Sequence, residues 1–472
     1  MKLNVLATAP ASRRAFLAGC AGCAAAAVCA KSAPQSAAGL LPATARPKIR
    51  LVFTHIPAGK PTWPHSEYDY DARKKELTAR LTQSCPSVEF LPATAHNAQD
   101  ARQILVDDRE VDGYLVYMVG IWTGAAITIA SANKPTLFVD DLYAGSGEFL
   151  TAYAAAKRKG LRVAPVASTR WDDVVQAVKG FDCIKKLQAS TILDIQNRPL
   201  GGDASAIQDV FGTTVRKIDG DQINSAYERA DQGRAQAAAA LWIKEAKRIV
   251  EPSREEIGKS GRMYVAMHDL LQEHKAQAVA IDCLSLFYAG KLAAYPCLGL
   301  FQFNNDGLVG ACEADLQSTI TMLAMTYLTG RPGYISDPVI DMAKNQIIYA
   351  HCVAPSKVYG PDGPSNPFHI RSHSEDRKGA SIRSLMPLGE MTTTLKINPG
   401  TRQIVFHQAK TVANIDEDKA CRTKLAAEVK DINKLLSEWD RWGWHRVTFY
   451  GDLKQPVETF SALMGFNLVV EG

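Results

Sequence analysis

The chain has 472 residues, of which 46% are hydrophobic and 22% charged, so disordered, collagen-like and coiled-coil chains are excluded. The formal charge is +5, but the first 30 residues hold three basic and no acidic residues, and the remainder has 51 basic against 49 acidic. This balance gives no reason to expect nucleic acid or a membrane surface as partner. Beyond residue 30, no apolar run reaches the ~18 residues of a transmembrane helix.

Residues 1–30 have the pattern of a twin-arginine signal peptide. Ser-Arg-Arg-Ala-Phe-Leu at 12–17 precedes a run of small apolar residues that ends in Val28-Cys29-Ala30, a candidate cleavage site. We therefore expect export by the twin-arginine translocase to a periplasmic or extracytoplasmic location. Cys20 fits a lipoprotein box, but it follows Arg14 too closely for a full apolar region, so lipid anchoring is less favoured. Folding before export would protect a weak Mn²⁺ site from Cu²⁺ and Zn²⁺.

Seven cysteines remain after this leader. They are odd in number, widely spaced and without a C-x-x-C pair, so neither a disulfide framework nor a cysteine-based zinc site is expected. We interpret most of them as small buried apolar residues. They are Cys85, Cys183, Cys283, Cys297, Cys312, Cys352 and Cys421.

The pattern beyond the leader predicts three folded regions. An Ala/Pro/Ser-rich linker at 31–47 is followed by alternating strand and helix patterns over 48–200, typical of a doubly wound parallel sheet. After Gly201-Gly202 a second α/β domain is expected over 201–345. Residues 346–472 contain alternating strands and turns, which predict an antiparallel, barrel-like β-rich domain. Within these regions we expect one long helix over 227–250 and another over 418–438.

Two carboxylates and two imidazoles are the strongest candidates for chemistry. Glu313 follows a short apolar strand, and Asp337 is expected at the end of another, where side chains of an α/β sheet face the ligand crevice. His351 is expected within a strand over 347–353, and His445 precedes the strand at 446–450. Oxygen and nitrogen donors of this kind suit Mn²⁺, Mg²⁺, Fe²⁺, Co²⁺ or Zn²⁺. The structural alternative is that the acids cap helices and the histidines are packed core residues.

These residues lie in segments that resemble known sugar isomerases. Ala-Cys-Glu313-Ala-Asp, the helix that follows it and the strand that carries Asp337 look like the L-fucose isomerase family. The strand Asn345 to His351 is similar to the L-arabinose isomerase type, and Trp444-His445 to Asp452 resembles the C-terminal strand of both. The resemblance covers about residues 270 to 470. The chain departs from it in being shorter than fucose isomerases and in carrying an export signal.

The resemblance implies an aldose–ketose isomerase that acts on an open-chain sugar through a cis-enediol. It implies that Glu313 and Asp337 bind a divalent metal, most naturally Mn²⁺, and move the proton between C2 and C1. His351 and His445 would complete the metal shell, and a homo-oligomer is expected by analogy. Six further residues are weaker candidates for substrate contacts, with capping, turn or surface roles as their alternatives: Asp282, Asn304, Asn305, Arg371, His373 and Glu390.

Two other classes of function fit the same residues. Two α/β lobes behind an export signal would suit an exported sugar-binding protein without catalysis, although the β-rich third region and the acid and histidine set argue against it. An epimerase, dehydratase or lyase of a polyhydroxy compound would keep the metal and the enediolate but change the product. No phosphate loop, Rossmann glycine fingerprint or G-x-S-x-G elbow is present, so those chemistries are not expected.

Overall fold

A computed structural model describes residues 40, 42 and 46–472 of the chain. The predicted signal peptide, with its twin-arginine motif and cleavage site, therefore lies outside the described residues. Within the described part, no helix combines the length and the apolar composition needed to cross a membrane.

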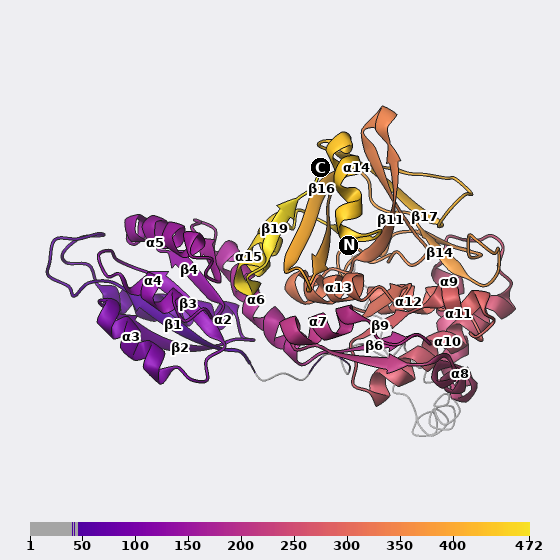
Figure 1. The fold of residues 1–472 in the computed structure, drawn as a ribbon, viewed down its shortest axis with the longest axis horizontal. Coiled ribbons are helices and arrows are strands. Elements are labelled where there is room, and N and C mark those ends of the chain that lie inside the picture. Colours follow the sequence, from indigo (N-terminus) through magenta and orange to yellow (C-terminus); the bar gives the residue numbers. More distant parts are fainter. Residues whose placement is uncertain (1–39, 41, 43–45) are drawn as a thin grey trace, which may run out of the picture. The chain divides into compact units, whose positions relative to one another are not determined.

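The first domain is a five-stranded parallel sheet with helices on both faces (Figure 1). The strand order is β2-β1-β3-β4-β5, and each neighbouring pair is parallel. Alternate side chains of the strands enter two separate cores, one beneath α2 and α6 and the other beneath α3, α4 and α5. The elements are β1 (Lys48–Thr54), α2 (Tyr70–Ser84), β2 (Glu89–Ala95), α3 (Ala98–Asp107), β3 (Gly113–Met118), α4 (Ala125–Ala130), β4 (Thr136–Asp140), α5 (Ser146–Arg158), β5 (Val163–Val166) and α6 (Trp171–Gln188).

A second parallel sheet, in the order β10-β9-β6-β7, has the same construction. One face is covered by α8 to α12 and the other by α7 and α13. The elements are β6 (Thr191–Ile195), α7 (Gly202–Phe211), β7 (Thr214–Ile218), α8 (Gly220–Arg229), α9 (Gln232–Glu245), α10 (Arg254–Glu273), β9 (Ala278–Ile281), α11 (Cys283–Tyr288), α12 (Cys297–Asn305), β10 (Val309–Cys312) and α13 (Leu316–Thr329).

The C-terminal part is a closed antiparallel barrel. Its strands follow the order β15-β18-β11-β12-β17-β16, and pairing of β15 with β16 closes the ring, while β19 adds to β16 in parallel. Together with the two parallel sheets, this barrel confirms the predicted fold class. The elements are β11 (Tyr334–Asp341), β12 (Gln346–His351), β15 (Met391–Asn398), β16 (Gln403–Asn414), β17 (Thr423–Val429), α14 (Ile432–Glu438), β18 (Arg446–Tyr450), α15 (Lys454–Met464) and β19 (Asn467–Val470).

A three-stranded sheet joins a segment of the second domain to loops beside the barrel. It has the order β14-β13-β8, in which β13 pairs antiparallel with β14 and parallel with β8. The strands are β8 (Arg248–Ile249), β13 (Phe368–Arg371) and β14 (Ser381–Ser384).

Helix α13 connects the second sheet to the barrel. Its apolar residues share one hydrophobic core with strands of the second sheet on one side and with barrel strands β15, β16 and β18 on the other. Figure 1 shows α13 between these two layers. The strand end at Cys312 and the barrel strands are therefore held close together, which places residues from both on one site.

Three local predictions were wrong. The expected helix over 227–250 is two helices, α8 and α9, because Asp231 caps a new helix by accepting a hydrogen bond from Arg234 N at 2.7 Å. The expected helix over 418–438 begins as a loop, continues as barrel strand β17 from Thr423, and is helical only in its last third. Asp337 lies inside the eight-residue strand β11 and not at the end of a short strand. Barrel pairing overrides the helix propensity of Leu, Ala, Glu and Lys in β17.

A buried ion pair ties the end of the chain to the barrel. Arg446 Nε and Nη2 each donate to a carboxylate oxygen of Glu471 at 3.0 Å, and His407 Nδ1 lies 2.9 Å from Glu471 Oε1. The Arg446 guanidinium also lies 4.2 Å from the centre of the Trp439 ring. Burial opposes ionisation of Glu471, but His407 and Arg446 outweigh it and lower the pKa of Glu471 to about 2.

We expect Glu471→Gln to lower the free energy of unfolding by roughly 3 kcal/mol near neutral pH, because it leaves the buried Arg446 charge unpaired. The folded pKa of Glu471 is depressed, so its contribution is complete above the unfolded pKa of about 4.3 and is lost as the pH falls towards 2. Urea unfolding at several pH values measures the free energy of unfolding of both proteins. The difference between wild type and variant should become smaller below about pH 4.3. Exposed Glu428→Gln is the matched control, and a gap independent of pH would contradict the assignment.

Candidate metal centre

Glu313 sits on a strained turn that the fold holds in place. Strand β10 ends at Cys312, and the next two residues have left-handed backbones, with φ of 62° at Glu313 and 49° at Ala314. Such a conformation costs an L-residue roughly 1–2 kcal/mol. Ala314 N donates to Ile281 O at 3.0 Å, and Asp315 caps α13 by accepting from Ser318 N at 2.9 Å. Backbone strain fixed by its surroundings is typical of functional positions.

Asp337 divides its two carboxylate oxygens between the two predicted histidines. Oδ2 lies 3.1 Å from His351 Nδ1, and Oδ1 lies 3.3 Å from His445 Nε2. Oδ1 also accepts a hydrogen bond from Trp444 Nε1 at 2.8 Å. The barrel produces this arrangement because β11 carries Asp337 between its neighbours β12, which ends at His351, and β18, which His445 precedes.

The four predicted residues form two overlapping groups that share Asp337. Ligand atoms of Glu313, Asp337 and His445 all lie within 4.8 Å of one another, and so do those of Asp337, His351 and Cys421. His445 Nε2 is 3.3 Å from Glu313 Oε2, and the two imidazole centres are 6.2 Å apart. Side chains separated by up to 132 positions in the chain are thus brought into one cluster.

Asp315 orients His445 from behind. Its Oδ2 lies 2.9 Å from His445 Nδ1, which turns Nε2 towards the carboxylates of Glu313 and Asp337. Lys396 Nζ lies 3.4 Å from the same oxygen of Asp315. A carboxylate behind an imidazole is a common outer partner of metal ligands. The sequence contained a signal for this role, because Asp315 is two residues from Glu313 and before a helix, but it was not singled out.

Charge coupling inside the cluster is strong. Burial opposes ionisation of Asp337 and of Glu313, yet their close contacts with the positively charged forms of His351 and His445 lower the pKa of both carboxyls. Burial likewise disfavours the charged imidazole, but Asp315, Asp337 and Glu313 raise the pKa of His445 to about 11. Asp337 also helps to raise the pKa of His351 despite its complete burial. The buried carboxylates are therefore stable only beside positive charge. A divalent cation bound to neutral imidazoles would provide this charge as well as protonated imidazoles would.

The donor set fits a divalent cation. Nε2 of His351 and Nε2 of His445 are buried and have no hydrogen-bond partner, although His445 Nε2 lies near two carboxylates. Leaving a buried polar atom unsatisfied costs about 1–3 kcal/mol, which binding to a metal would remove. Two carboxylates and two imidazoles are ligands that Mn²⁺, Fe²⁺, Co²⁺ and Zn²⁺ accept.

Three of the weaker substrate candidates are engaged with protein groups. Asp282 pairs with Arg198 at 3.1 Å. Asn304 exchanges two hydrogen bonds with the backbone of Gly310, at 2.9 and 3.0 Å, and so fixes the start of β10. Asn305 Oδ1 accepts from the backbone N–H groups of Ser356 and Lys357. The side chains of both asparagines thus make hydrogen bonds to the backbone of neighbouring segments.

The other three candidates lie in or beside loops around the barrel. Arg371 forms ion pairs with Glu251 and Asp418. His373 is buried, with Nδ1 3.3 Å from Asp376 Oδ1. Glu390 accepts a hydrogen bond from Tyr359.

Comparison with known proteins gives partial matches to sulfoquinovose isomerases. One from Priestia aryabhattai is 32% identical over 131 residues, 27% of this chain and 28% of the relative. Others are from Alkalicoccus urumqiensis, 26% identical over 37% of this chain and 40% of the relative, and from a Clostridium species, 26% identical over 42% and 44%. The matches thus span less than half of each relative's length. No protein-family model matches the chain.

We expect Asp315→Asn to weaken divalent-metal binding roughly 10- to 100-fold. The substitution removes the negative charge that orients His445 and favours Nε2 as the nitrogen that binds the metal. Asparagine is also a good helix cap, so the cap of helix α13 should be kept in this variant. Metal titration followed by calorimetry measures the effect. Asp231→Asn makes the same change at the cap of α9 and is the control. Unchanged metal affinity in Asp315→Asn would remove Asp315 from the centre.

Proposed function

We propose that this protein is a metal-dependent aldose–ketose isomerase that acts on an open-chain sugar. The observation that supports this most directly is the pairing of two carboxylates, Glu313 and Asp337, around the Nε2 atom of His445 within 4.8 Å. Isomerisation requires one proton to leave C2 and one to arrive at C1, so it needs acid–base groups beside a centre that stabilises negative charge.

The partial matches support the same reaction class. All three relatives described above are sulfoquinovose isomerases, and their names suggest the substrate to test first. We propose sulfoquinovose as the leading aldose, with L-fucose and L-arabinose as comparison substrates. We propose Mn²⁺ as the cation, because a site rich in carboxylate oxygens suits it.

The two carboxylates would carry the proton. The ionised carboxylate of Glu313 or Asp337 takes the proton from C2, and the resulting acid returns it to C1 of the enediol. The bound cation would polarise the carbonyl and lower the pKa of the neighbouring C–H and O–H groups. His351 and His445 would hold the cation as neutral nitrogen donors, while Asp315 and Trp444 keep His445 and Asp337 in position through their hydrogen bonds.

We expect Glu313→Gln and Asp337→Asn each to lower turnover by at least 10²- to 10⁴-fold, the usual contribution of positioned acid–base catalysis, while the protein stays folded. NMR in D₂O should show deuterium at C1 of the ketose product with wild type. Exposed Glu428→Gln is the control for the loss of one carboxylate and should keep full activity.

The same spectra separate the rival functions. Full activity in Glu313→Gln would contradict its assigned role. Loss of water, a C–C cleavage product or an inverted C2 centre would indicate a dehydratase, lyase or epimerase. Sugar binding without turnover at any metal concentration would indicate a binding protein.

We also propose that the protein is exported, which rests on the residues Ser12 to Leu17 and the apolar run after them. Replacing Arg13 and Arg14 together by Lys should leave the protein in the cytoplasm with its leader uncleaved, because the twin-arginine pair is the recognised feature. Cell fractionation and intact mass measure this. Replacing Lys2 by Arg is the control, and unchanged export of the double variant would contradict the proposal.

A further inference from the structure

We infer that the thiol of Cys421 binds the same cation as a sulfur ligand, beside the carboxylate and imidazole donors. This inference rests on the metal centre of the proposed function and extends it. Cys421 Sγ lies 3.6 Å from Asp337 Oδ2, and it lies within 4.8 Å of a ring nitrogen of His351. The sulfur thus belongs to the second of the two groups that share Asp337.

His351, which shares a ligand group with Cys421 and Asp337, has one ring nitrogen without a hydrogen-bond partner. His351 is completely buried, its Nδ1 faces Asp337, and its Nε2 has no hydrogen-bond partner. Cys421 is partly buried, whereas the other six free cysteines of the described residues are buried. A buried nitrogen, a carboxylate oxygen and a thiol within reach of one another form a ligand set and not an isolated cysteine.

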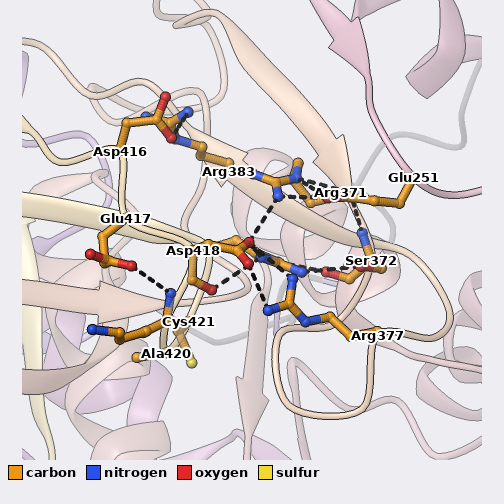
Figure 2. A network of polar contacts seen from close by, with 12 residues as sticks. Glu251, Arg371, Ser372, Arg377, Arg383, Asp416, Glu417, Asp418, Ala420 and Cys421 are labelled. Atoms are coloured by element: carbon orange, nitrogen blue, oxygen red, sulfur yellow. Dashed lines mark hydrogen bonds and ion pairs between the residues drawn. The ribbon is translucent and has the colours of Figure 1, made fainter.

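The loop that carries Cys421 is fixed by an extended network of charges (Figure 2). Asp418, three residues earlier, accepts hydrogen bonds from Arg377 at 2.7 and 2.9 Å and from Arg422 at 2.8 Å. Arg422 is buried and donates to the carbonyl and hydroxyl of Ser372.

Two further contacts complete this network. Asp416 pairs with Arg383 at 2.8 Å, and Lys424 donates to the carbonyl oxygens of Glu417 and Cys421. The loop and the segment containing Ser372 and Arg377 are therefore held as one unit.

This network maintains an unfavourable backbone conformation next to the thiol. Ala420 has φ of 58°, in the left-handed region that costs an L-residue roughly 1–2 kcal/mol. The same kind of strain occurs at Glu313 and Ala314 on the other side of the cluster. Strain that surrounding contacts hold in place indicates that the position of the side chain matters.

A thiolate ligand would change which metals the centre prefers. Binding replaces the thiol proton with the cation, so one proton is released for each Cys421–metal bond formed. Thiolate is a soft ligand that favours Zn²⁺ and Co²⁺ more than Mn²⁺. Loss of the sulfur should therefore weaken binding of Co²⁺ more than binding of Mn²⁺.

Cys352 provides a matched control. Its sulfur lies 3.7 Å from that of Cys421, but Cys352 is buried and is in neither ligand group of the described residues. A variant at Cys352 thus removes a neighbouring thiol from the same environment without removing the proposed ligand.

The test is the absorption spectrum of the protein loaded with Co²⁺. We expect wild type and Cys352→Ser to show a thiolate-to-cobalt charge-transfer band in the near ultraviolet, and Cys421→Ser to lack it. The Kd for Co²⁺ should rise roughly 10- to 100-fold in Cys421→Ser, and the Kd for Mn²⁺ should rise less.

Three results would overturn the inference: visible bands of bound Co²⁺ in wild type without a charge-transfer band, a band that survives in Cys421→Ser, or no Co²⁺ binding at all. The proposed function fails separately, because the band can be present in a protein that turns over no aldose. Conversely, isomerase activity with metal but without the band would leave the proposed function standing and remove Cys421 from the centre.

Discussion

The charge balance around Asp337 is the interaction on which the site depends. Its carboxylate lies between two buried imidazoles and close to Glu313, so the cluster is stable only with positive charge inside it. Protonated histidines would provide this positive charge, and a divalent cation with neutral histidines would provide it as well. The same constraint accounts for Asp315 and Lys396 behind His445, because Asp315 orients the imidazole and Lys396 offsets the additional negative charge.

Topology explains how residues so distant in sequence reach one cluster. Glu313 follows the carboxyl end of β10 in a parallel sheet, where ligands of α/β folds usually bind. Asp337 and His351 lie on the adjacent barrel strands β11 and β12, and His445 directly precedes β18, the other neighbour of β11. Helix α13 shares a core with both, so its packing sets the distance between Glu313 and the barrel residues.

The sequence predicted the fold class and four residues of the cluster, but not the neighbouring Asp315 and Cys421. Alternation of apolar runs and helices indicated the two parallel sheets, because most of their strands, such as β3 and β9, are buried on both faces. The predicted metal ligands were found from their positions near strand ends and from a resemblance to known isomerases. Both arguments can be made from the sequence without knowledge of three-dimensional contacts. Asp315 was not among the predicted ligands, although it lies two residues after Glu313 and before a helix, and Cys421 was grouped with the other cysteines as small buried apolar residues. In β17, pairing with β12 and β16 decides the structure, and no local pattern reports such long-range pairing.

Left-handed backbone on two sides of the cluster argues that the site is built under strain and not by chance proximity. Glu313 and Ala314 are held by the cap of α13 and by a hydrogen bond to β9, while Ala420 is held by the arginine and carboxylate network of its loop. These supports come from different parts of the fold and lie on either side of the cluster. Strain of this size persists only where the surrounding contacts outweigh it. Strained backbone on both sides of the cluster is therefore expected if the fold serves to place the side chains of the cluster.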